Sequence, residues 1–287
     1  MRLAVLGMGK MGHALAERLL GREHEVSVWN RTRHKADDLL AKGAREASCP
    51  AAAAEEAQAT FTSLADDAAV RAVVTGRDGV AAGLGDGILI DASTVSPETT
   101  TDLSETVGGR LLASPILGSP MAVVAGEATY LIGGPRELVD RLAPAYDALA
   151  EAGHRRYVGE DARAATTLKL LSNYLLMSGI ATLAETVATA QAVGLPDELI
   201  LDYLGHLPLV APALRNRLHD IVSGDHDGWF STSLGAKDVR LADDLAKSHG
   251  VLLPLADAVK RRYEEAATQG WADADIGAVV ELLRAHG

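Results

Sequence analysis

The stretch Gly7-Met8-Gly9-Lys10-Met11-Gly12 decides the fold of the N-terminal half. It closes an apolar run, Arg2–Gly7, that predicts a strand, and it opens a helical pattern that continues to about Leu20. In such a unit the first glycine allows a tight turn, the second lets the backbone approach a pyrophosphate, and the third permits close packing of helix on strand. The helix N-terminus adds N–H groups and a partial positive charge. All six residues therefore belong to a predicted dinucleotide-binding turn.

Short apolar runs alternate with helical patterns over the rest of the N-terminal half. After the first run, a helix is expected over Lys35–Ala41, and strands over Glu25–Asn30, Thr60–Leu64, Ile88–Ser93, Leu111–Leu117 and Thr129–Gly133. Continuous apolar strands separated by helices are typical of a parallel sheet covered on both faces. We therefore expect a doubly wound α/β domain of the Rossmann type over residues 1–162, with its ligand where strand C-termini meet helix N-termini.

From residue 163 the chain is predicted to be helical throughout. The first helix runs over the 31 residues 163–193 and stops at Gly194-Leu195-Pro196, a helix terminator. It would span roughly 45 Å at about 1.5 Å per residue, which is long enough to join two domains. Further helices are expected over 196–204, 211–221, 234–248, 255–269 and 274–285. The interpretation is an all-α domain over residues 163–287, attached to the first domain by a long interdomain helix.

Composition limits the classes of function. The chain has 287 residues, a net charge of −12 and one cysteine, Cys49. A disulfide scaffold is excluded, and no histidine or cysteine spacing predicts a metal site. The negative charge argues against a nucleic-acid partner. The start does not read as a secretory signal, and the apolar stretch 168–192 carries too many polar residues to span a membrane. We expect a cytoplasmic protein that acts on a small molecule.

The end of the second predicted strand bears on which cofactor binds. An NAD-selective site places Asp or Glu there to bind the ribose diol, whereas this chain has Asn30-Arg31-Thr32-Arg33. Asn30 can bond to the ribose without repelling a phosphate, Arg31 can stack on adenine and pair with a 2′-phosphate, and Thr32 can add a donor. These residues favour NADP (NADPH). The alternative is that Arg31, Arg33 and Lys35 form an ordinary solvated helix start.

Lys169 and Asn173 are four residues apart on the long predicted helix and therefore share one face. On so apolar a helix, a lysine facing a nicotinamide would be desolvated and its pKa lowered, which suits a group that exchanges a proton during hydride transfer. Spacing alone favours the simpler interpretation of a surface lysine at a helix start.

A set of motifs changes that preference, because together they resemble those of the β-hydroxyacid dehydrogenase family. That family includes 3-hydroxyisobutyrate dehydrogenase and the glyoxylate and succinic semialdehyde reductases, and imine reductases are its relatives. The resemblance covers essentially the whole chain. It is carried by VLGMGKMG at 5–12, DASTVSPETT at 91–100, P-x-x-G-S-P at 115–120, Lys169-x-x-x-Asn173, KDVRLA at 237–242 and GWADADIGAVVELL at 270–283.

The resemblance implies a role for each matching residue. Lys169 would be the catalytic acid/base and Asn173 would hold the substrate oxygen. Ser93 and Thr94 would contact substrate and nicotinamide, and Lys237 would close over the cofactor. Leu64 and Ala65 would lie along the dinucleotide, and the loop Leu117-Gly118-Ser119 would bind a substrate carboxylate. A homodimer is expected, and a tetramer is also compatible with the resemblance.

Two departures from the family pattern keep other functions open. Leu117 stands where the family commonly has a serine, and Arg163-Ala164-Ala165 replaces a G-x-G pair. The segment Gly159-Glu160-Asp161 looks more like imine reductases, although those enzymes resemble the family with Asp or Tyr at the position of Lys169. The leading hypothesis is an NADP-dependent oxidoreductase that interconverts a small aldehyde acid and its hydroxy acid. The alternatives are a reductase of imines or uncharged carbonyls, and a non-catalytic NADPH-binding module.

Overall fold

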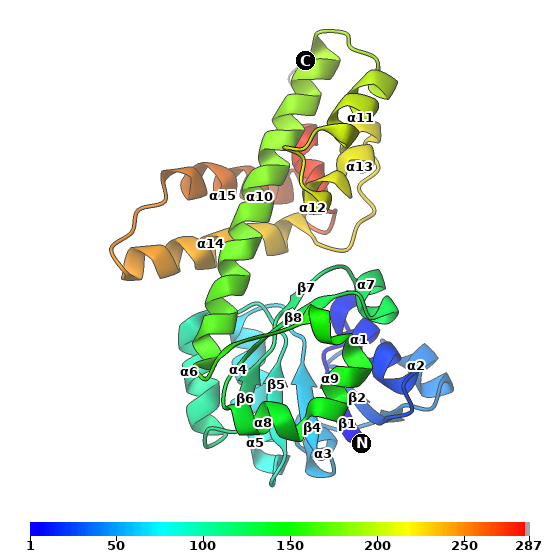
Figure 1. Ribbon diagram of the computed structural model, residues 1–287, viewed down its shortest axis with the longest axis vertical. Coiled ribbons are helices and arrows are strands. Elements are labelled where there is room, and N and C mark those ends of the chain that lie inside the picture. Colours follow the sequence, from blue (N-terminus) through cyan, green and yellow to red (C-terminus); the bar gives the residue numbers. More distant parts are fainter. Residues whose placement is uncertain (285–287) are drawn as a thin grey trace. The chain divides into compact units, whose positions relative to one another are not determined.

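A computed structural model describes residues 1–284. The chain forms two compact units, Met1–Lys169 and Leu170–Gly287, here called the first and second unit. Helix α10 (Ala162–Ala192) belongs to both, because the division falls within it, after Lys169 (Figure 1). Its 31 residues confirm the long predicted helix to within one residue at each end.

The first unit is built on a sheet of nine strands in the order β3-β2-β1-β4-β5-β6-β8-β7, with β9 also paired to β8. The pairs from β3 to β6 and the pair β8–β9 are parallel. The strands are β1 (Arg2–Leu6), β2 (Glu25–Trp29), β3 (Arg45–Glu46), β4 (Ala59–Thr62), β5 (Ile88–Asp91), β6 (Leu111–Ala113), β7 (Ile116–Leu117), β8 (Thr129–Gly133) and β9 (Arg155–Gly159).

The prediction of a wholly parallel sheet is wrong at one end, where β8 pairs antiparallel with both β6 and β7. The single strand predicted over Leu111–Leu117 is interrupted at Ser114-Pro115, where proline has no N–H to donate. The connection from Leu117 to Thr129 is also shorter than the dozen or more residues that a parallel crossover needs. Strands β3 and β9 were not predicted, because their arginines interrupt any apolar run.

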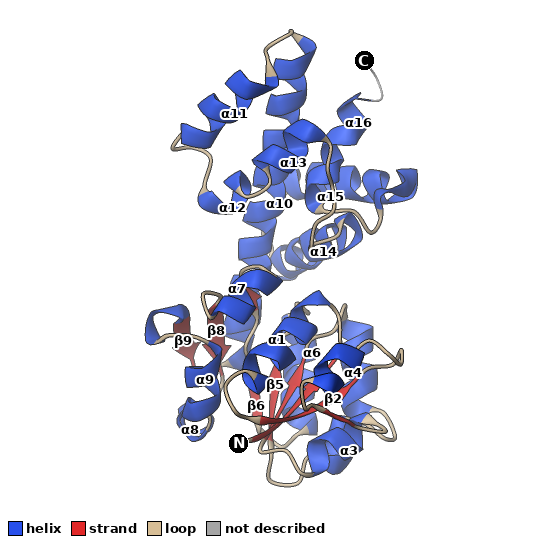
Figure 2. Ribbon diagram, turned by 90° about the vertical axis from the view of Figure 1, so that its right-hand side faces the viewer, coloured by secondary structure: helices blue, strands red, loops and turns tan. Residues whose placement is uncertain are grey.

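Helices cover both faces of the sheet, which confirms the doubly wound fold (Figure 2). Within β1, Leu3 and Val5 join the core on one face, and Ala4 and Leu6 join the core on the other. The first core includes α1 (Lys10–Leu20), α2 (Asp37–Ala41), α7 (Pro120–Ala125), α8 (Arg136–Arg141) and α9 (Ala143–Leu149). The second includes α3 (Pro50–Glu55), α4 (Asp67–Thr75), α5 (Val80–Gly83) and α6 (Pro97–Thr106).

The second unit is all-helical over its described residues, as predicted. It consists of the rest of α10 with α11 (Asp197–His206), α12 (Pro212–Arg215), α13 (Leu218–Ser223), α14 (Thr232–Ser248), α15 (Pro254–Ala266), the short turns η2 (Ala267–Trp271) and η3 (Ile276–Val280), and α16 (Glu281–Arg284). Two predictions are corrected: 211–221 is two helices, and the segment from 274 is a 3₁₀ turn followed by one short helix. Residue 285 lies outside the described residues. Among residues 1–284, no helix is long and apolar enough to cross a membrane.

Candidate functional site

The glycine turn between β1 and α1 has the geometry that a pyrophosphate needs. Gly7 has φ +96°, in the left-handed region, and donates its N–H to the Trp29 carbonyl at 2.9 Å. A Cβ on Gly12 would lie 1.9 Å from the Gly7 carbonyl oxygen, so only glycine lets α1 pack so closely. A Cβ on Gly9 would meet nothing within 4 Å. Gly9 therefore leaves open space in front of the N-terminus of α1, and the turn fits the phosphates of a dinucleotide.

A cleft of about 600 Å³ begins at this turn. Its walls come from the ends of β1, β2 and β4, from α4 and from the loop 76–79. The cleft brings together many of the residues predicted to bind cofactor, namely Gly7, Gly9, Asn30, Arg31, Thr32, Leu64 and Ala65. Met8, Lys10, Met11 and Gly12 form the turn and the first turn of α1, and Thr94 lies in the loop between β5 and α6.

Asn30 connects the end of β2 to the glycine turn. Its Oδ1 accepts a hydrogen bond from the Met8 N–H at 2.9 Å, and its Nδ2 donates to the Thr32 carbonyl at 2.8 Å. The side chain thus determines the shape of the loop that carries Arg31. No carboxylate is present in the segment Trp29–Thr32 that lines the cleft.

The ends of β4 and β5 are joined by side-chain hydrogen bonds. The Leu64 N–H donates to Ser93 Oγ at 3.0 Å, so two of the predicted contacts touch each other. The Thr62 hydroxyl donates to Asp91 Oδ1 at 2.8 Å, and the Ser93 N–H donates to the same oxygen at 3.1 Å. Asp91 is not among the site residues predicted from the sequence. The available signal was a carboxylate at the C-terminal end of a buried strand, where α/β folds bind ligands.

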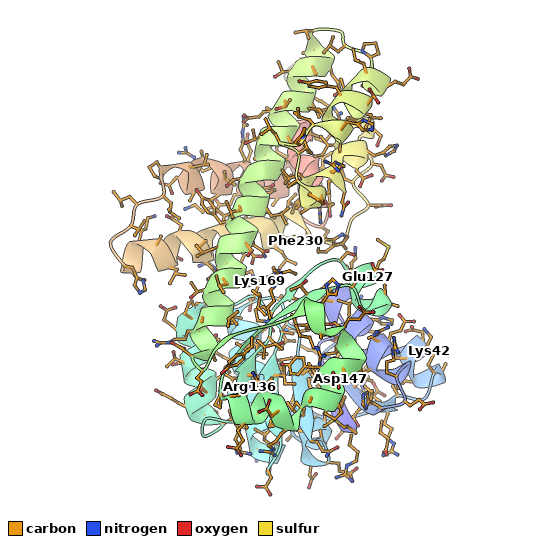
Figure 3. The ribbon with its side chains drawn as sticks, viewed as in Figure 1. Lys42, Glu127, Arg136, Asp147, Lys169 and Phe230 are labelled. Carbon is orange, nitrogen blue, oxygen red and sulfur yellow. The ribbon has the colours of Figure 1, made fainter. Side chains whose placement is uncertain are left out.

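Lys169 lies on the part of α10 that belongs to the first unit (Figure 3). Its Nζ donates a hydrogen bond to the carbonyl of Ile116 on β7 at 2.7 Å. The next residues are the predicted substrate loop, in which Gly118 has φ +146° and Ser119 Oγ accepts the Ala122 N–H at 3.1 Å. The ammonium group is therefore held at the start of that loop. Leu117, in the same loop, packs against the small core of Ala113, Leu131 and Ala165.

In the second unit, a buried carboxylate connects two of the predicted residues. Asn173 Nδ2 donates to Asp238 Oδ2 at 2.5 Å, and Lys237 Nζ lies 3.0 Å from Asp238 Oδ1. The Asp238 side chain is 3% exposed and that of Lys237 is 13% exposed. Asp238 thus orients both the amide and the ammonium group. Asp238 belongs to the KDVRLA motif but is not among the site residues predicted from the sequence, although a buried charge on a helix generally has a partner.

Comparison with known proteins shows similarity over the full length. Residues 2–168 match the family model for the NAD binding domain of 6-phosphogluconate dehydrogenase, and residues 164–283 match that for NAD-binding of NADP-dependent 3-hydroxyisobutyrate dehydrogenase. The chain is 33% identical to the uncharacterized oxidoreductase YfjR of Bacillus subtilis, covering 99% of this chain and 100% of that one. It is 30% identical to glyoxylate/succinic semialdehyde reductase 1 of Arabidopsis thaliana, covering 99% of each chain.

A solved structure with a similar fold is 3-hydroxyisobutyrate dehydrogenase from Salmonella typhimurium. The TM-score is 0.88 at 25% sequence identity, and the match covers 98% of this chain and 99% of that one.

Proposed function

Because this chain belongs to the β-hydroxyacid dehydrogenase family, we propose that it transfers a hydride between NADPH and a small aldehyde acid or the matching hydroxy acid. The chain has an NAD(P)-binding domain, and the dehydrogenases and reductases among its relatives support an oxidoreductase. The choice of NADP and of this substrate class rests on the residues of the site.

The observation that carries the proposal is the hydrogen bond from Lys169 to the Ile116 carbonyl at 2.7 Å. It holds an ammonium group beside the loop Leu117-Gly118-Ser119, where a substrate carboxylate would be bound by backbone N–H groups. When bound in the cleft, the dinucleotide would supply the hydride that the carbonyl carbon accepts. Lys169 donates a proton to the carbonyl oxygen, which becomes the hydroxyl, and the neutral lysine then regains a proton from water. In the oxidation direction the same amine accepts the hydroxyl proton.

The preference for NADP rests on the residues at the end of β2, which form one wall of the cleft. Arg31 lines this wall and can pair with a 2′-phosphate, whereas no carboxylate of Trp29–Thr32 is present to repel it. In this proposal Gly7, Gly9 and the N-terminus of α1 receive the pyrophosphate, and Leu64 and Ala65 lie along the dinucleotide.

The substrate proposal is tested by NADPH oxidation, with NADH in parallel, against small semialdehydes, glyoxylate and cyclic imines. Turnover of an aldehyde acid with NADPH is the expected result. Turnover only of imines or uncharged carbonyls would favour the alternative reductase, which Leu117 suggests because it removes a hydroxyl donor from the carboxylate loop. Binding of NADPH without turnover of any substrate would favour a non-catalytic binding module.

The cofactor proposal is tested by two matched variants of the loop after β2. Arg31 and Arg33 are both exposed, but only Arg31 lines the cleft. Loss of a charge-assisted hydrogen bond in Arg31→Ala should raise the Kd of NADPH at least about tenfold, with little change for NADH. Arg33→Ala is the control and should change the Kd of NADPH less. Equal weakening of NADPH and NADH by Arg31→Ala would contradict NADP selectivity.

We also propose that the chain forms a homodimer or a tetramer. Apolar side chains of the second unit support association, since Leu175 on α10 is 72% exposed and Tyr203 on α11 is 63% exposed. Light scattering of the purified protein tests this, and a monomer would contradict it.

A further inference from the structure

Asp91 is a buried carboxylate that the proposed chemistry does not use. It is the last residue of β5 and is 3% exposed. Burial of a carboxylate is costly unless hydrogen bonds compensate. Here Asp91 Oδ1 accepts from the Thr62 hydroxyl at 2.8 Å and from the Ser93 N–H at 3.1 Å.

These two hydrogen bonds join the loops that follow neighbouring strands. Thr62 is the last residue of β4, and the loop after it carries Leu64 and Ala65. Ser93 lies in the loop after β5. The Ala92 N–H also donates to the Thr62 carbonyl at 2.8 Å, and the Leu64 N–H donates to Ser93 Oγ. The Asp91 carboxylate is therefore part of a set of hydrogen bonds that connects two loops. Both loops are proposed to contact the dinucleotide.

A second carboxylate holds the far end of the β5–α6 loop. Asp67 Oδ1, on α4, accepts from the Ser96 N–H at 2.9 Å, from the Ser96 hydroxyl at 2.6 Å and from the Thr99 hydroxyl at 2.5 Å. Residues 92–96 are thus anchored by Asp91 at one end and by Asp67 at the other. Thr94, a proposed nicotinamide contact, lies between the two anchors.

The electrostatics differ between the two anchors. Burial raises the pKa of Asp91 to about 6, although hydrogen bonds from Ser93 and Thr62 oppose it, and the charge of Asp67 raises it further. Burial also acts to raise the pKa of Asp67, but the hydrogen bonds from Ser96 and Thr99 outweigh it and lower the pKa. Of the two anchors, Asp91 is therefore the one whose ionised form is destabilised by burial. Buried carboxylates with a raised pKa, kept at a cost in stability, are found at functional sites.

We propose that Asp91 is a positioning residue, whose carboxylate holds the loops 63–65 and 92–94 in the arrangement in which Ser93 and Thr94 meet the nicotinamide end of the cofactor. The inference rests on the proposed function for what the loops bind. Asp91 acts through its hydrogen bonds with Thr62 and Ser93 and does not itself touch the substrate.

Two threonines of β4 provide a matched test. Thr60 and Thr62 are both fully buried, and they point to the same face of the sheet because they are two residues apart on one strand. The Thr62 hydroxyl donates to Asp91, whereas within the described part of the chain the Thr60 hydroxyl has no hydrogen-bond partner. Thr62→Val and Thr60→Val therefore make the same chemical change, and only the first removes a hydrogen bond from Asp91.

The first readout is steady-state turnover with the best substrate of the panel. Because small displacements of reacting groups have large effects on rate, Thr62→Val should lower kcat at least about tenfold. The KM for NADPH should change less than about threefold, since the adenosine half is held at the glycine turn and β2. Thr60→Val should match the wild type. Equal kcat values for the two variants, or a drop in melting temperature of Thr62→Val with kcat unchanged, would overturn the proposal.

The second readout does not need turnover. Amide hydrogen exchange of the cofactor-free protein should be about tenfold faster over residues 63–65 and 92–96 in Thr62→Val than in Thr60→Val. Equal exchange rates would overturn the loop connection. If the wild type turns over no substrate, the proposed function fails, and the exchange comparison still decides whether Asp91 joins the loops.

Two replacements of Asp91 test whether its side chain acts by accepting hydrogen bonds. In Asp91→Asn the amide oxygen can still accept from Thr62 and Ser93, whereas in Asp91→Ala nothing can. We expect Asp91→Asn to restore most of the kcat that Asp91→Ala loses. Similar kcat values for both variants, well below the wild type, would show that the side-chain oxygen does not position the loops.

Discussion

Replacing Asp91 with asparagine should change how stability depends on pH. Asparagine has nearly the same shape and no charge. Burial raises the pKa of Asp91 from its ordinary 3.8 to about 6 in the folded chain. At about 1.4 kcal/mol per pKa unit, this difference corresponds to about 3 kcal/mol. The side chain is 3% exposed, so solvent screening reduces this value little.

The direction follows from where the proton is held more tightly. The folded state binds the Asp91 proton more tightly than the unfolded state, so raising the pH from about 4 to about 6 removes stability from the wild type. Below pH 4 the carboxyl group is protonated in both states and this loss is absent. The asparagine variant cannot ionise at this position. Its free energy of unfolding should therefore rise relative to the wild type by up to about 3 kcal/mol between pH 4 and pH 7.

The assay is urea denaturation of both proteins, followed by circular dichroism, at several pH values from about 4 to about 7. The quantity of interest is the difference in unfolding free energy, in which the titration of all other groups cancels. Asp67→Asn is the control that should show no comparable rise over this range, because the pKa of Asp67 is lowered in the folded chain and its titration is confined to pH values near and below 4. A difference between wild type and Asp91→Asn that stays constant with pH, or that falls as pH rises, would refute the reasoning.

Three further predictions concern other parts of the chain. Lys169→Ala should lower turnover about 10²- to 10⁴-fold while the Kd of NADPH, measured by fluorescence, stays nearly unchanged; retained turnover would contradict its role in proton transfer. Gly12→Ala should lower the melting temperature because its Cβ would lie 1.9 Å from a backbone carbonyl. Gly9→Ala should melt like the wild type but bind NADPH more weakly. Equal melting temperatures for the two variants would contradict the close packing of Gly12 against the Gly7 carbonyl. Arg217→Ala removes the buried partner of Asp275, whose Oδ1 lies 3.0 Å from the guanidinium Nε, and should cost about 3 kcal/mol in urea denaturation; a cost below about 1 kcal/mol would contradict the importance of this pair.

Patterns close together in the sequence were sufficient to predict the fold class. The strand–turn–helix unit around Gly7 and Gly12, the alternation of apolar runs and helices, and the long helix up to Gly194 are each determined by neighbouring residues. Backbone preference, helical periodicity and helix termination all act over a few residues. For the same reason the sequence identified Arg31 and Lys169 as candidates, since each stands in a recognisable local context.

Tertiary structure decided which of these residues have partners. Thr62 and Asp91 are 29 residues apart, and Asn173 and Asp238 are 65 apart. A hydrogen bond between such distant residues leaves no periodic signal along the chain, so the partners of the buried carboxylates at the candidate site could not be predicted from the sequence. The antiparallel pairing of β8 likewise depends on which strands the short connection after Leu117 can reach. These features arise from contacts that exist only when the chain has folded.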